Sequence, residues 1–316
     1  MRVVVCELVW PEGLEELRRL GEVVYDPGLW QRPRDLCALA RGAEALIVRN
    51  QTRVDGRLLD FADGLRVIGR IGVGLDNIDL EAAGRRGVKV VYARNANATS
   101  VAEYVMAALL RACRELDAAT SSVRSGGWDR ARFTGAELCG KTLGLVGLGE
   151  ISRRVARRAG AFGMRLLGHD PFVGPYDFPV AELGVEPVGL GELLERSDFV
   201  SLHLPLTPKT RHLLSRDELS GIKRGAWLIN TSRGGIVDEN ALLEVLEENR
   251  LAGAVLDVLE EEPPASESPL LSHERVLVTP HVAGLTGESQ VRSSVLVARE
   301  VGKVLRGEGS LCLAGG

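Results

Sequence analysis

Three ionisable side chains each follow a predicted strand, in positions where their chemistry can be combined. Arg233 closes the stretch "AWLINTSR", Glu262 closes "GAVLDVLEEE" and His281 closes "VLVTPH". Because the carboxyl ends of parallel strands share one edge of a sheet, we expect the three side chains to converge there. A histidine can exchange a hydroxyl proton near neutral pH, and a glutamate can hold its ring and favour the protonated form. An arginine offers a planar fork to a carboxylate and polarises a neighbouring carbonyl.

This combination favours hydride transfer to or from the carbon of a 2-hydroxy or 2-oxo acid. Each residue also has an ordinary structural interpretation. A single histidine after a strand is often part of the packing, acidic residues before prolines are usually solvated, and Arg233 alone is compatible with a surface ion pair. Their occurrence together at three strand ends favours the catalytic interpretation.

The stretch "LVGLGEISRRVA" resembles a dinucleotide-binding turn between a predicted strand at 142–147 and a helix. Gly147 permits a tight turn, and Gly149 lets the backbone approach a pyrophosphate at the helix N-terminus. Ser152 stands where the G-x-G-x-x-G pattern has its third glycine, which serves helix packing, so a small serine is tolerated. Asp170 follows about 20 residues on, where a carboxylate accepts bonds from ribose hydroxyls and repels the extra phosphate of NADP. The turn therefore predicts NAD, and the alternative is a merely packed turn.

Composition excludes several classes of function. The 316 residues carry a formal net charge of −4, which provides no broad basic field for nucleic acid. The 5 cysteines include no C-x-x-C pair, so neither a disulfide framework nor a zinc site is predicted, and we expect no metal. No apolar run approaches the length of a membrane span, and the chain opens on a strand without a leader pattern. We therefore expect a cytoplasmic protein that binds neither nucleic acid nor membrane.

Strand and helix patterns alternate along the whole chain. Before residue 95, strand candidates alternate with helical stretches at 12–20, 33–41, 55–63 and 79–86, which is typical of a parallel sheet covered on both faces. A second alternation runs from a long helix at 99–116 through further strands to a last helix at 286–306. The acidic, proline-rich stretch "EEEPPASESPLLSHE" is expected to be exposed. The prediction is an α/β protein of two doubly wound parallel-sheet domains with a ligand cleft between them.

The sequence resembles the D-2-hydroxyacid dehydrogenase family, most closely its 3-phosphoglycerate dehydrogenase and sulfolactate dehydrogenase branches. The motifs "GRIGVGLDNIDLEAA", "VAEYVMAALL", "GKTLGLVGLGEI", "INTSRGGIVDE", "LDVLEEEP" and "TPHVAG" are similar to the family's signatures, in its order. The resemblance implies that His281, Glu262 and Arg233 are catalytic, with Glu260 and Glu261 weaker choices than Glu262. It also implies a flavodoxin-like substrate domain at 1–96 plus 284–316 and a Rossmann NAD-binding domain at 97–283. The residues then expected around the cofactor are Gly147, Gly149, Glu150, Ile151, Asp170, Leu204, Pro205, Thr210, Thr231, Ser232, Asp257 and Gly284.

Two arginines suggest what the substrate carries. The resemblance implies that the N–H groups of Val73 and Gly74 bind the substrate carboxylate. Arg49 and Arg70 both end predicted strands on the same edge, so both can face a group on the third carbon. Unpaired arginines in a partly dry site would discriminate against pyruvate or glyoxylate, which predicts a phosphorylated or sulfonated three-carbon acid. If the arginines instead pair with Asp76 or Asp79, the activity becomes a hydroxypyruvate or glyoxylate reductase of broad specificity.

Association with other chains is also implied. The resemblance implies a homodimer through the helix at 99–116 and an arm at 120–139, with Arg130 or Arg132 as candidates to reach the partner's site. That helix is apolar on more than one face, which either a dimer or simple burial explains; its apolar residues include Val101, Tyr104, Val105, Ala108, Leu109 and Ala112. Relatives of this fold also act as NAD-sensing corepressors that keep the same trio. Such a binding protein usually has extra disordered tails, which this chain lacks.

Overall fold

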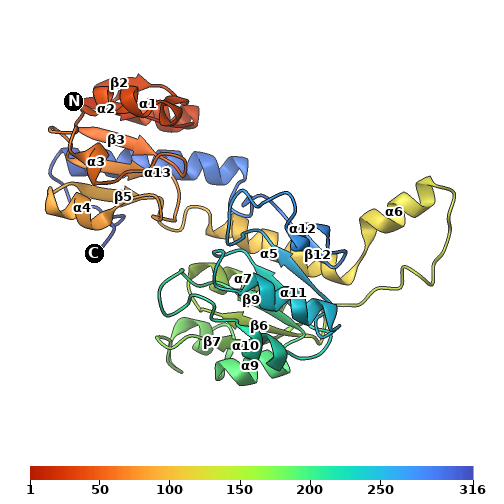
Figure 1. Cartoon of the computed structure of the whole chain (residues 1–316). Coiled ribbons are helices and arrows are strands. Elements are labelled where there is room, and N and C mark those ends of the chain that lie inside the picture. Colours follow the sequence, from red (N-terminus) through yellow and green to blue (C-terminus); the bar gives the residue numbers. More distant parts are fainter. Residues whose placement is uncertain (316) are drawn as a thin grey trace. The chain divides into compact units, whose positions relative to one another are not determined.

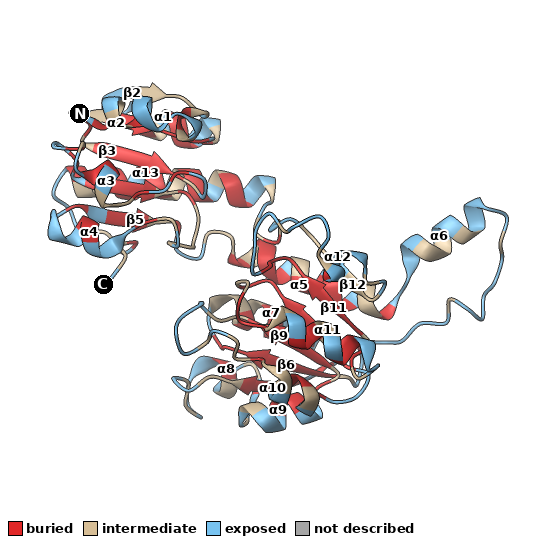
Figure 2. Cartoon of the chain, viewed as in Figure 1, coloured by how far each residue is buried: buried red, intermediate tan, exposed pale blue. Residues whose placement is uncertain are grey.

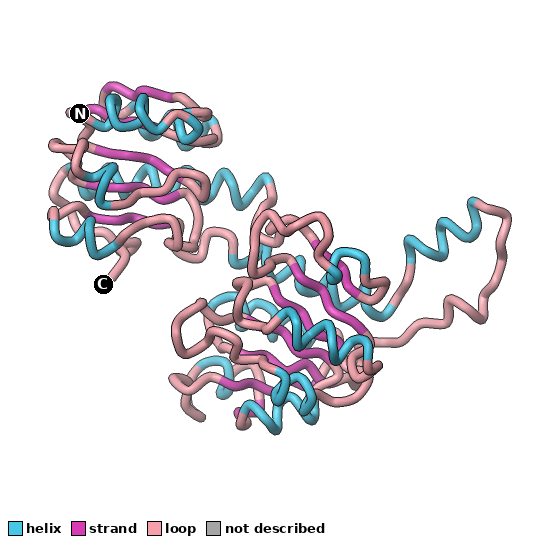
Figure 3. The backbone as a smooth tube through the Cα atoms, in the orientation of Figure 1, coloured by secondary structure: helices cyan, strands magenta, loops and turns pink. Residues whose placement is uncertain are grey.

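The computed structural model describes residues 1–315 and divides into two compact units. One unit is Met1–Asn97 with Leu285–Gly316, and the other is Ala98–Gly284 (Figure 1). The chain therefore passes from one unit to the other twice, between Asn97 and Ala98 and between Gly284 and Leu285. Each unit is a parallel sheet with helices, which confirms the predicted α/β class (Figure 3).

The first unit contains a five-stranded parallel sheet. Its strands are β1 (Arg2–Val5), β2 (Glu22–Tyr25), β3 (Ala45–Val48), β4 (Val67–Arg70) and β5 (Lys89–Tyr92), in the order β2-β1-β3-β4-β5. Its helical segments are α1 (Pro11–Arg18), η1 (Leu29–Gln31), α2 (Pro33–Ala40), α3 (Gly56–Leu59), α4 (Leu80–Arg85) and α13 (Gly287–Leu305). The C-terminal α13, blue in Figure 1, packs on α1 and β4 of this N-terminal sheet.

Local sequence explains these elements. The central strands are runs of valine, leucine and isoleucine buried on both faces, as parallel strands between helices require (Figure 2). Pro11 and Pro33 occupy first helical positions, where the missing N–H costs no helical hydrogen bond. The helix predicted at 55–63 is wrong in length, because α3 ends at Leu59. Tight turns follow it, in which the N–H groups of Phe61 and Ala62 donate to Leu58 and Leu59.

The second unit contains a seven-stranded parallel sheet. Its strands are β6 (Thr142–Val146), β7 (Arg165–His169), β8 (Glu186–Pro187), β9 (Phe199–Leu202), β10 (Trp227–Asn230), β11 (Gly253–Leu256) and β12 (Val276–Val278), in the order β12-β11-β10-β9-β6-β7-β8. Its helices are α5 (Ala98–Cys113), α6 (Leu116–Arg124), α7 (Glu150–Ala161), α8 (Phe178–Ala181), α9 (Leu190–Arg196), α10 (Arg216–Gly221), α11 (Glu239–Glu247) and α12 (Pro269–Ser272). The edge strand β8 is exposed and has no apolar run, so sequence patterns did not predict it.

The long helix predicted at 99–116 is wrong at its end. α5 stops at Cys113, and the Leu116 N–H donates to the Arg114 carbonyl before α6 begins. α6 has no buried residue, whereas α5 buries much of its surface within its own unit, against α7 and β10. Val101, Val105, Ala108 and Leu109 are all buried there. Simple burial therefore accounts for these apolar side chains, and they no longer count in favour of a dimer.

The acidic stretch after β11 is only partly the exposed loop that was predicted. Most of its residues are exposed, but α12 forms within it and Leu270 is 3% exposed. Leu270 packs into the core that lies between the sheet and α11. A single apolar residue therefore anchors this stretch, which sequence composition alone did not reveal.

Candidate active site

The carboxyl ends of five strands in the second unit lie in one row. The register aligns Val146, Leu202, Asn230, Leu256 and Val278 as neighbours across β6, β9, β10, β11 and β12. Each strand therefore enters its following loop at the same level of the sheet. The loops begin with Gly147, His203, Thr231, Asp257 and Thr279. This is the edge at which α/β sheets bind ligands.

The glycine turn after β6 has the geometry that its sequence predicts. Gly147 has φ +90°, and a Cβ there would lie 2.5 Å from the His203 carbonyl oxygen, so only glycine fits. A Cβ at Gly149 would meet nothing within 4 Å, so no protein atom explains that glycine. Gly149 is the N-cap residue of α7, and no side chain caps that N-terminus. Asp170 supports the turn, because its Oδ2 accepts from the Leu148 N–H at 2.9 Å.

The departure from the glycine pattern is accommodated inside the turn. Ser152 is 0% exposed, and its hydroxyl donates to the Gly147 carbonyl oxygen. The serine therefore braces the turn from within α7 and adds no atom to its outer face. Glu150, at the first position of α7, is held by Arg154 at 2.6 Å, with Arg153 at 3.5 Å. Both arginines reduce the repulsion that Glu150 would exert on an anion at the helix N-terminus.

Several features of this edge fit a dinucleotide. The Thr231 hydroxyl is buried and has no hydrogen-bond partner within residues 1–315. The space beyond Gly149 and the uncapped N-terminus of α7 are the groups that bind a pyrophosphate. Leu204 packs against Gly147, and the Thr210 hydroxyl donates to the Pro205 carbonyl at 2.6 Å, which shapes the loop after β9. The residues present therefore fit the predicted cofactor.

His281 and Glu262 form a directly bonded pair. His281 Nδ1 lies 2.8 Å from Glu262 Oε2, and the Leu259 N–H donates to Glu262 Oε1 at 3.1 Å. Burial raises the pKa of Glu262, but the His281 hydrogen bond and charge, the Leu259 N–H and Arg233 together lower it below its ordinary value. The His281 side chain is 48% exposed, so the pair with Glu262 leaves much of the side chain open. The Arg233 Nη1 donates to the Ser232 carbonyl at 2.7 Å.

The other acidic residues before Pro263 have different surroundings. Glu260 Oε1 lies 3.0 Å from His212 Nε2, and the Glu260 N–H donates to Glu239 at 2.6 Å. Burial and the charge of Glu260 are among the causes that raise the pKa of Glu239. Glu261 is exposed. Of the three consecutive glutamates, Glu262 is the one that bonds to His281.

A second histidine at this edge is a poor candidate for proton exchange. His203 follows β9, and its Nε2 lies 3.0 Å from the Ser201 hydroxyl. Burial lowers the pKa of His203 to about 3, so its ring stays neutral at the pH of the cell. A histidine that exchanges protons must be able to change charge near neutrality, which His203 does not.

The Asp257 carboxylate accepts hydrogen bonds from the loop that carries His281. It is 1% exposed; its Oδ1 accepts from the Thr279 hydroxyl at 2.6 Å and from the Val282 N–H at 2.8 Å. Its Oδ2 accepts from the Ala283 N–H at 2.8 Å. The resemblance implies a place for Asp257 beside the cofactor; the structure shows that its carboxylate holds the backbone just before Gly284.

In the first unit, Arg49 is held by several groups. Its guanidinium donates to Gln290 Oε1 at 2.8 Å and to the Leu8 carbonyl at 3.5 Å. Its backbone N–H donates to the buried Glu7 at 2.7 Å, and Glu7 also accepts from the N–H groups of Gln51 and Thr52. Burial lowers the pKa of Arg49, and the charge of Glu7 opposes that shift.

Arg70 lies against the glycine-rich loop after β4. A Cβ at Gly72 would overlap the Arg70 guanidinium, and Gly72 has φ +148°, so glycine is needed on both counts. Within the described chain, the N–H groups of Val73 and Gly74 donate to no protein acceptor. A cation and free backbone donors therefore lie in one loop, as an anion site requires.

Sequence reasoning missed the residues that hold these groups in place. Glu7 is separated by 42 residues from the Arg49 N–H that it accepts, and Gln290 by 241 residues from the Arg49 guanidinium. Asn77 likewise bonds the carbonyls of Arg49 and Thr52. No local pattern joins such distant positions. The one available signal was a glutamate directly after an apolar strand, where a buried carboxylate needs several donors.

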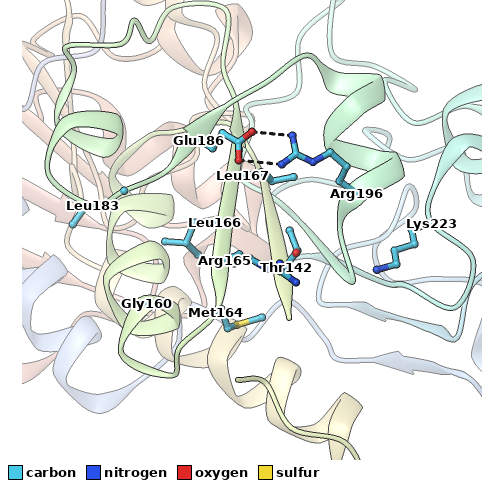
Figure 4. Close-up of a pocket in the computed structure, with 11 residues that line it drawn as sticks. Thr142, Gly160, Met164, Arg165, Leu166, Leu167, Leu183, Glu186, Arg196 and Lys223 are labelled. Carbon is cyan, nitrogen blue, oxygen red and sulfur yellow. Dashed lines mark hydrogen bonds and ion pairs between the residues drawn. The ribbon is translucent and has the colours of Figure 1, made fainter. Parts of the chain in front are cut away.

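A hollow of about 470 Å³ lies elsewhere in the second unit (Figure 4). It includes Thr142 and Arg165, the first residues of β6 and β7, so it lies at the amino edge of the sheet. Two of its three cations are paired with carboxylates, since Arg196 donates to Glu186 and Lys223 to Asp198 at 2.8 Å, and the third, Arg165, donates to the Gly140 carbonyl. This hollow is therefore separate from the candidate active site. No group of His, Cys, Asp and Glu that could hold a metal ion occurs in the described part of the chain.

Known proteins resemble this chain in sequence and in fold. Residues 106–283 match the D-isomer specific 2-hydroxyacid dehydrogenase, NAD binding domain. The chain is 44% identical over 310 residues to D-3-phosphoglycerate dehydrogenase of Methanocaldococcus jannaschii, covering 98% of this chain and 58% of that protein. It is 43% identical over 303 residues to (S)-sulfolactate dehydrogenase of Chromohalobacter salexigens, covering 96% and 98%. The crystal structure of the TT0316 protein from Thermus thermophilus matches with TM-score 0.90 and 36% identity, covering 99% and 100%.

The chain therefore belongs to the D-isomer specific 2-hydroxyacid dehydrogenase family, which confirms the predicted resemblance. The matched domain is the family's NAD-binding domain, so NAD is the cofactor. The chain spans 58% of the length of the phosphoglycerate dehydrogenase that it matches. None of the described helices is long and apolar enough to cross a membrane.

Proposed function

We propose that this chain interconverts a D-2-hydroxy acid and its 2-oxo acid with NAD. The observation that carries the proposal is the 2.8 Å contact between His281 Nδ1 and Glu262 Oε2, at the sheet edge that also bears the glycine turn. NAD, when bound, supplies or takes up the hydride. The residues that would hold it are Gly147, Gly149, Glu150, Ile151, Asp170, Leu204, Pro205, Thr210, Thr231, Ser232, Asp257 and Gly284.

The pair assigns the proton transfer to one ring nitrogen. An ionised Glu262 can only accept, so His281 Nδ1 carries a hydrogen and Nε2 faces the substrate. In the oxidising direction the hydroxyl proton passes to Nε2 while the C2 hydride leaves and the C–O bond becomes a carbonyl. In the reducing direction Nε2 returns that proton to the carbonyl oxygen. Glu262 stabilises the imidazolium, and Arg233 polarises the carbonyl and binds the carboxylate.

The substrate class follows from the first unit. We propose that the N–H groups of Val73 and Gly74 bind the substrate carboxylate and that Arg70 binds an anionic group on the third carbon. Arg70 is supported by its position against Gly72 in the same loop. Arg49 is held by Gln290 and Leu8, so its contribution is mainly the field of a fixed positive charge. A three-oxygen anion fits this arrangement, as in 3-phosphoglycerate or sulfolactate.

One observation favours a second candidate, a hydroxypyruvate or glyoxylate reductase of broad specificity. The Arg49 guanidinium already has acceptors inside its own unit, so it does not need a substrate anion. The Arg70 Nη1 likewise donates to the Ile71 carbonyl, at 3.2 Å, so neither arginine depends on a charged substrate tail for a hydrogen bond.

NADH oxidation with five acids separates these activities. The panel is pyruvate, glyoxylate, hydroxypyruvate, 3-phosphohydroxypyruvate and 3-sulfopyruvate, followed by nicotinamide absorbance. We expect fast turnover of one acid with an anionic tail, and Arg70→Ala should raise its KM at least tenfold. Arg85→Ala, an exposed arginine paired with Glu81, is the control. Preference for hydroxypyruvate or glyoxylate supports the broad reductase, and NADH binding without turnover supports a corepressor-like protein.

We further propose a homodimer formed through the arm. Leu116, Val123 and Trp128 are 69%, 52% and 78% exposed, an unusual amount of apolar surface for one short segment. Light scattering should give twice the chain mass for the wild type and one chain mass for the Val123→Asp, Trp128→Asp double variant. Leu311→Asp, at an exposed leucine outside the arm, should remain dimeric. The 5 cysteines are free, which fits a reducing compartment such as the cytoplasm.

A further inference from the structure

Three side chains form a hydrogen-bonded series beneath the loop that carries His281. The Tyr104 hydroxyl of α5 lies 2.5 Å from the Thr279 hydroxyl, which lies 2.6 Å from Asp257 Oδ1. Tyr104 and Thr279 are separated by 175 residues, and Thr279 and Asp257 by 22. The series therefore joins α5 to the loops after β11 and β12.

The chemistry of these groups fixes the direction of each bond. An ionised Asp257 can only accept, so the single Thr279 hydroxyl hydrogen is donated to it. The Thr279 oxygen is then free to accept, and Tyr104 must donate to it. Burial raises the pKa of Tyr104, so the phenol keeps its hydrogen at neutral pH. Removing either hydroxyl leaves a polar partner without its bond in a partly buried place.

Asp257 is in turn hydrogen-bonded to the backbone around His281. Its side chain accepts from the N–H groups of Val282 and Ala283, and its carbonyl accepts from the His281 N–H at 2.9 Å. The His281 backbone has φ +54°, a conformation that residues other than glycine adopt only when their surroundings hold it. The bonds to Asp257 lie on both sides of that position. They supply the support that the strained backbone needs.

We infer that Tyr104 and Thr279 are positioning residues for His281. They orient Asp257, which holds the loop so that the ring of His281 meets Glu262 on one side and the substrate on the other. This inference rests on the proposed role of His281 in proton transfer. Neither residue is among those assigned to the substrate or the cofactor, so we expect their loss to lower the rate of the chemical step more than it weakens cofactor binding.

Thr279→Val, Thr279→Ser and Tyr104→Phe test the inference on the full chain. Val keeps the shape of Thr279 and removes its hydroxyl, Ser keeps the hydroxyl, and Phe removes only the phenol oxygen. Thr142→Val is the matched control, because Thr142 is a buried threonine at the amino end of β6, beside the hollow of Figure 4. For each variant, kcat and KM are measured with the best acid of the panel, the NADH Kd is measured by nicotinamide fluorescence, and Tm is recorded.

We expect Thr279→Val to lower kcat at least tenfold and Tyr104→Phe about threefold, with the NADH Kd and KM within about twofold of wild type. Thr279→Ser should recover most of kcat, and Thr142→Val should match the wild type. Equal kcat for the Val and wild-type chains, or failure of Ser to recover kcat, overturns the inference. If Thr279→Val does not fold, a wild-type kcat in Tyr104→Phe overturns the inference instead. His281→Asn is measured in parallel, because unchanged turnover in that variant overturns the proposed function itself.

Discussion

Each unit of this chain uses one buried carboxylate to shape a neighbouring loop, and the two loops do different work. Glu7, 4% exposed, follows β1 and accepts three N–H bonds from the loop after β3, its neighbour in the sheet. Asp257, 1% exposed, follows β11 and accepts from the loop after β12, its neighbour. The first loop begins with Arg49, and the second carries His281.

The two loops differ in how firmly the functional side chain itself, Arg49 or His281, is hydrogen-bonded. The Arg49 guanidinium is bonded to Gln290 and Leu8, so its charge is fixed in place. His281 is bonded to Glu262 through one nitrogen and is 48% exposed. A group that only attracts an anion can be held by several partners. A group that exchanges a proton must keep part of its side chain open, so more of its support has to come through the backbone of its loop.

The largest expected effect on kcat comes from removing the imidazole of His281. His281→Asn should lower kcat by about 10²–10⁴-fold, because general acid–base catalysis contributes that much. Single-turnover NADH oxidation measures the loss, with His273→Asn, a histidine outside the site, as the control. A loss below tenfold would mean that the proton comes from another group.

The two carboxylates should both matter for stability. Glu7→Ala and Asp257→Ala each leave several backbone donors without an acceptor, so each should reduce the free energy of unfolding by about 3 kcal/mol. Urea unfolding measures this, with the exposed Glu261→Ala as control. Only Asp257→Ala should also lower kcat for acids without a charged tail, such as glyoxylate. If Glu7→Ala lowers that kcat equally, the distinction between the two loops is wrong.

Displacing Arg70 without removing its charge tests the first unit alone. Ala at Gly72 would overlap the Arg70 guanidinium, so Gly72→Ala should raise KM for the acid with an anionic tail about tenfold. Gly87→Ala is the matched control, because Gly87 also has positive φ but has nothing within 4 Å of the added Cβ. A similar rise in KM for hydroxypyruvate would show that the loop, and not Arg70, has been disturbed.

The smallest effect concerns pH. The pKa of Glu262 is lowered, so its pair with His281 adds stability above the ordinary glutamate range, and this contribution is lost as pH falls through the lowered pKa. Because both side chains are partly exposed, the effect should be below about 1 kcal/mol. The unfolding free energy of wild type minus Glu262→Gln, measured from pH 7 down to acid, should shrink towards zero. A difference that is constant across this range would contradict the pairing.

The sequence by itself determined the parallel α/β class, the glycine turn and the placement of Arg233, Glu262 and His281 after strands. These features depend on short-range patterns, since strand periodicity, turn glycines and strand ends are read within a few residues. Local composition also singled out Ser152 as a tolerable replacement. The sequence patterns did not predict the end of α5 at Cys113 or the short strand β8, because neither has a distinctive apolar pattern.

Only the tertiary structure decided how these residues are held. Glu7 beneath Arg49, Gln290 on its guanidinium and Tyr104 on Thr279 all join positions far apart in the chain. Each bond depends on which strands are neighbours and on which helix covers them. A buried carboxylate accepts whatever donors the fold brings to it, and no local pattern specifies those donors.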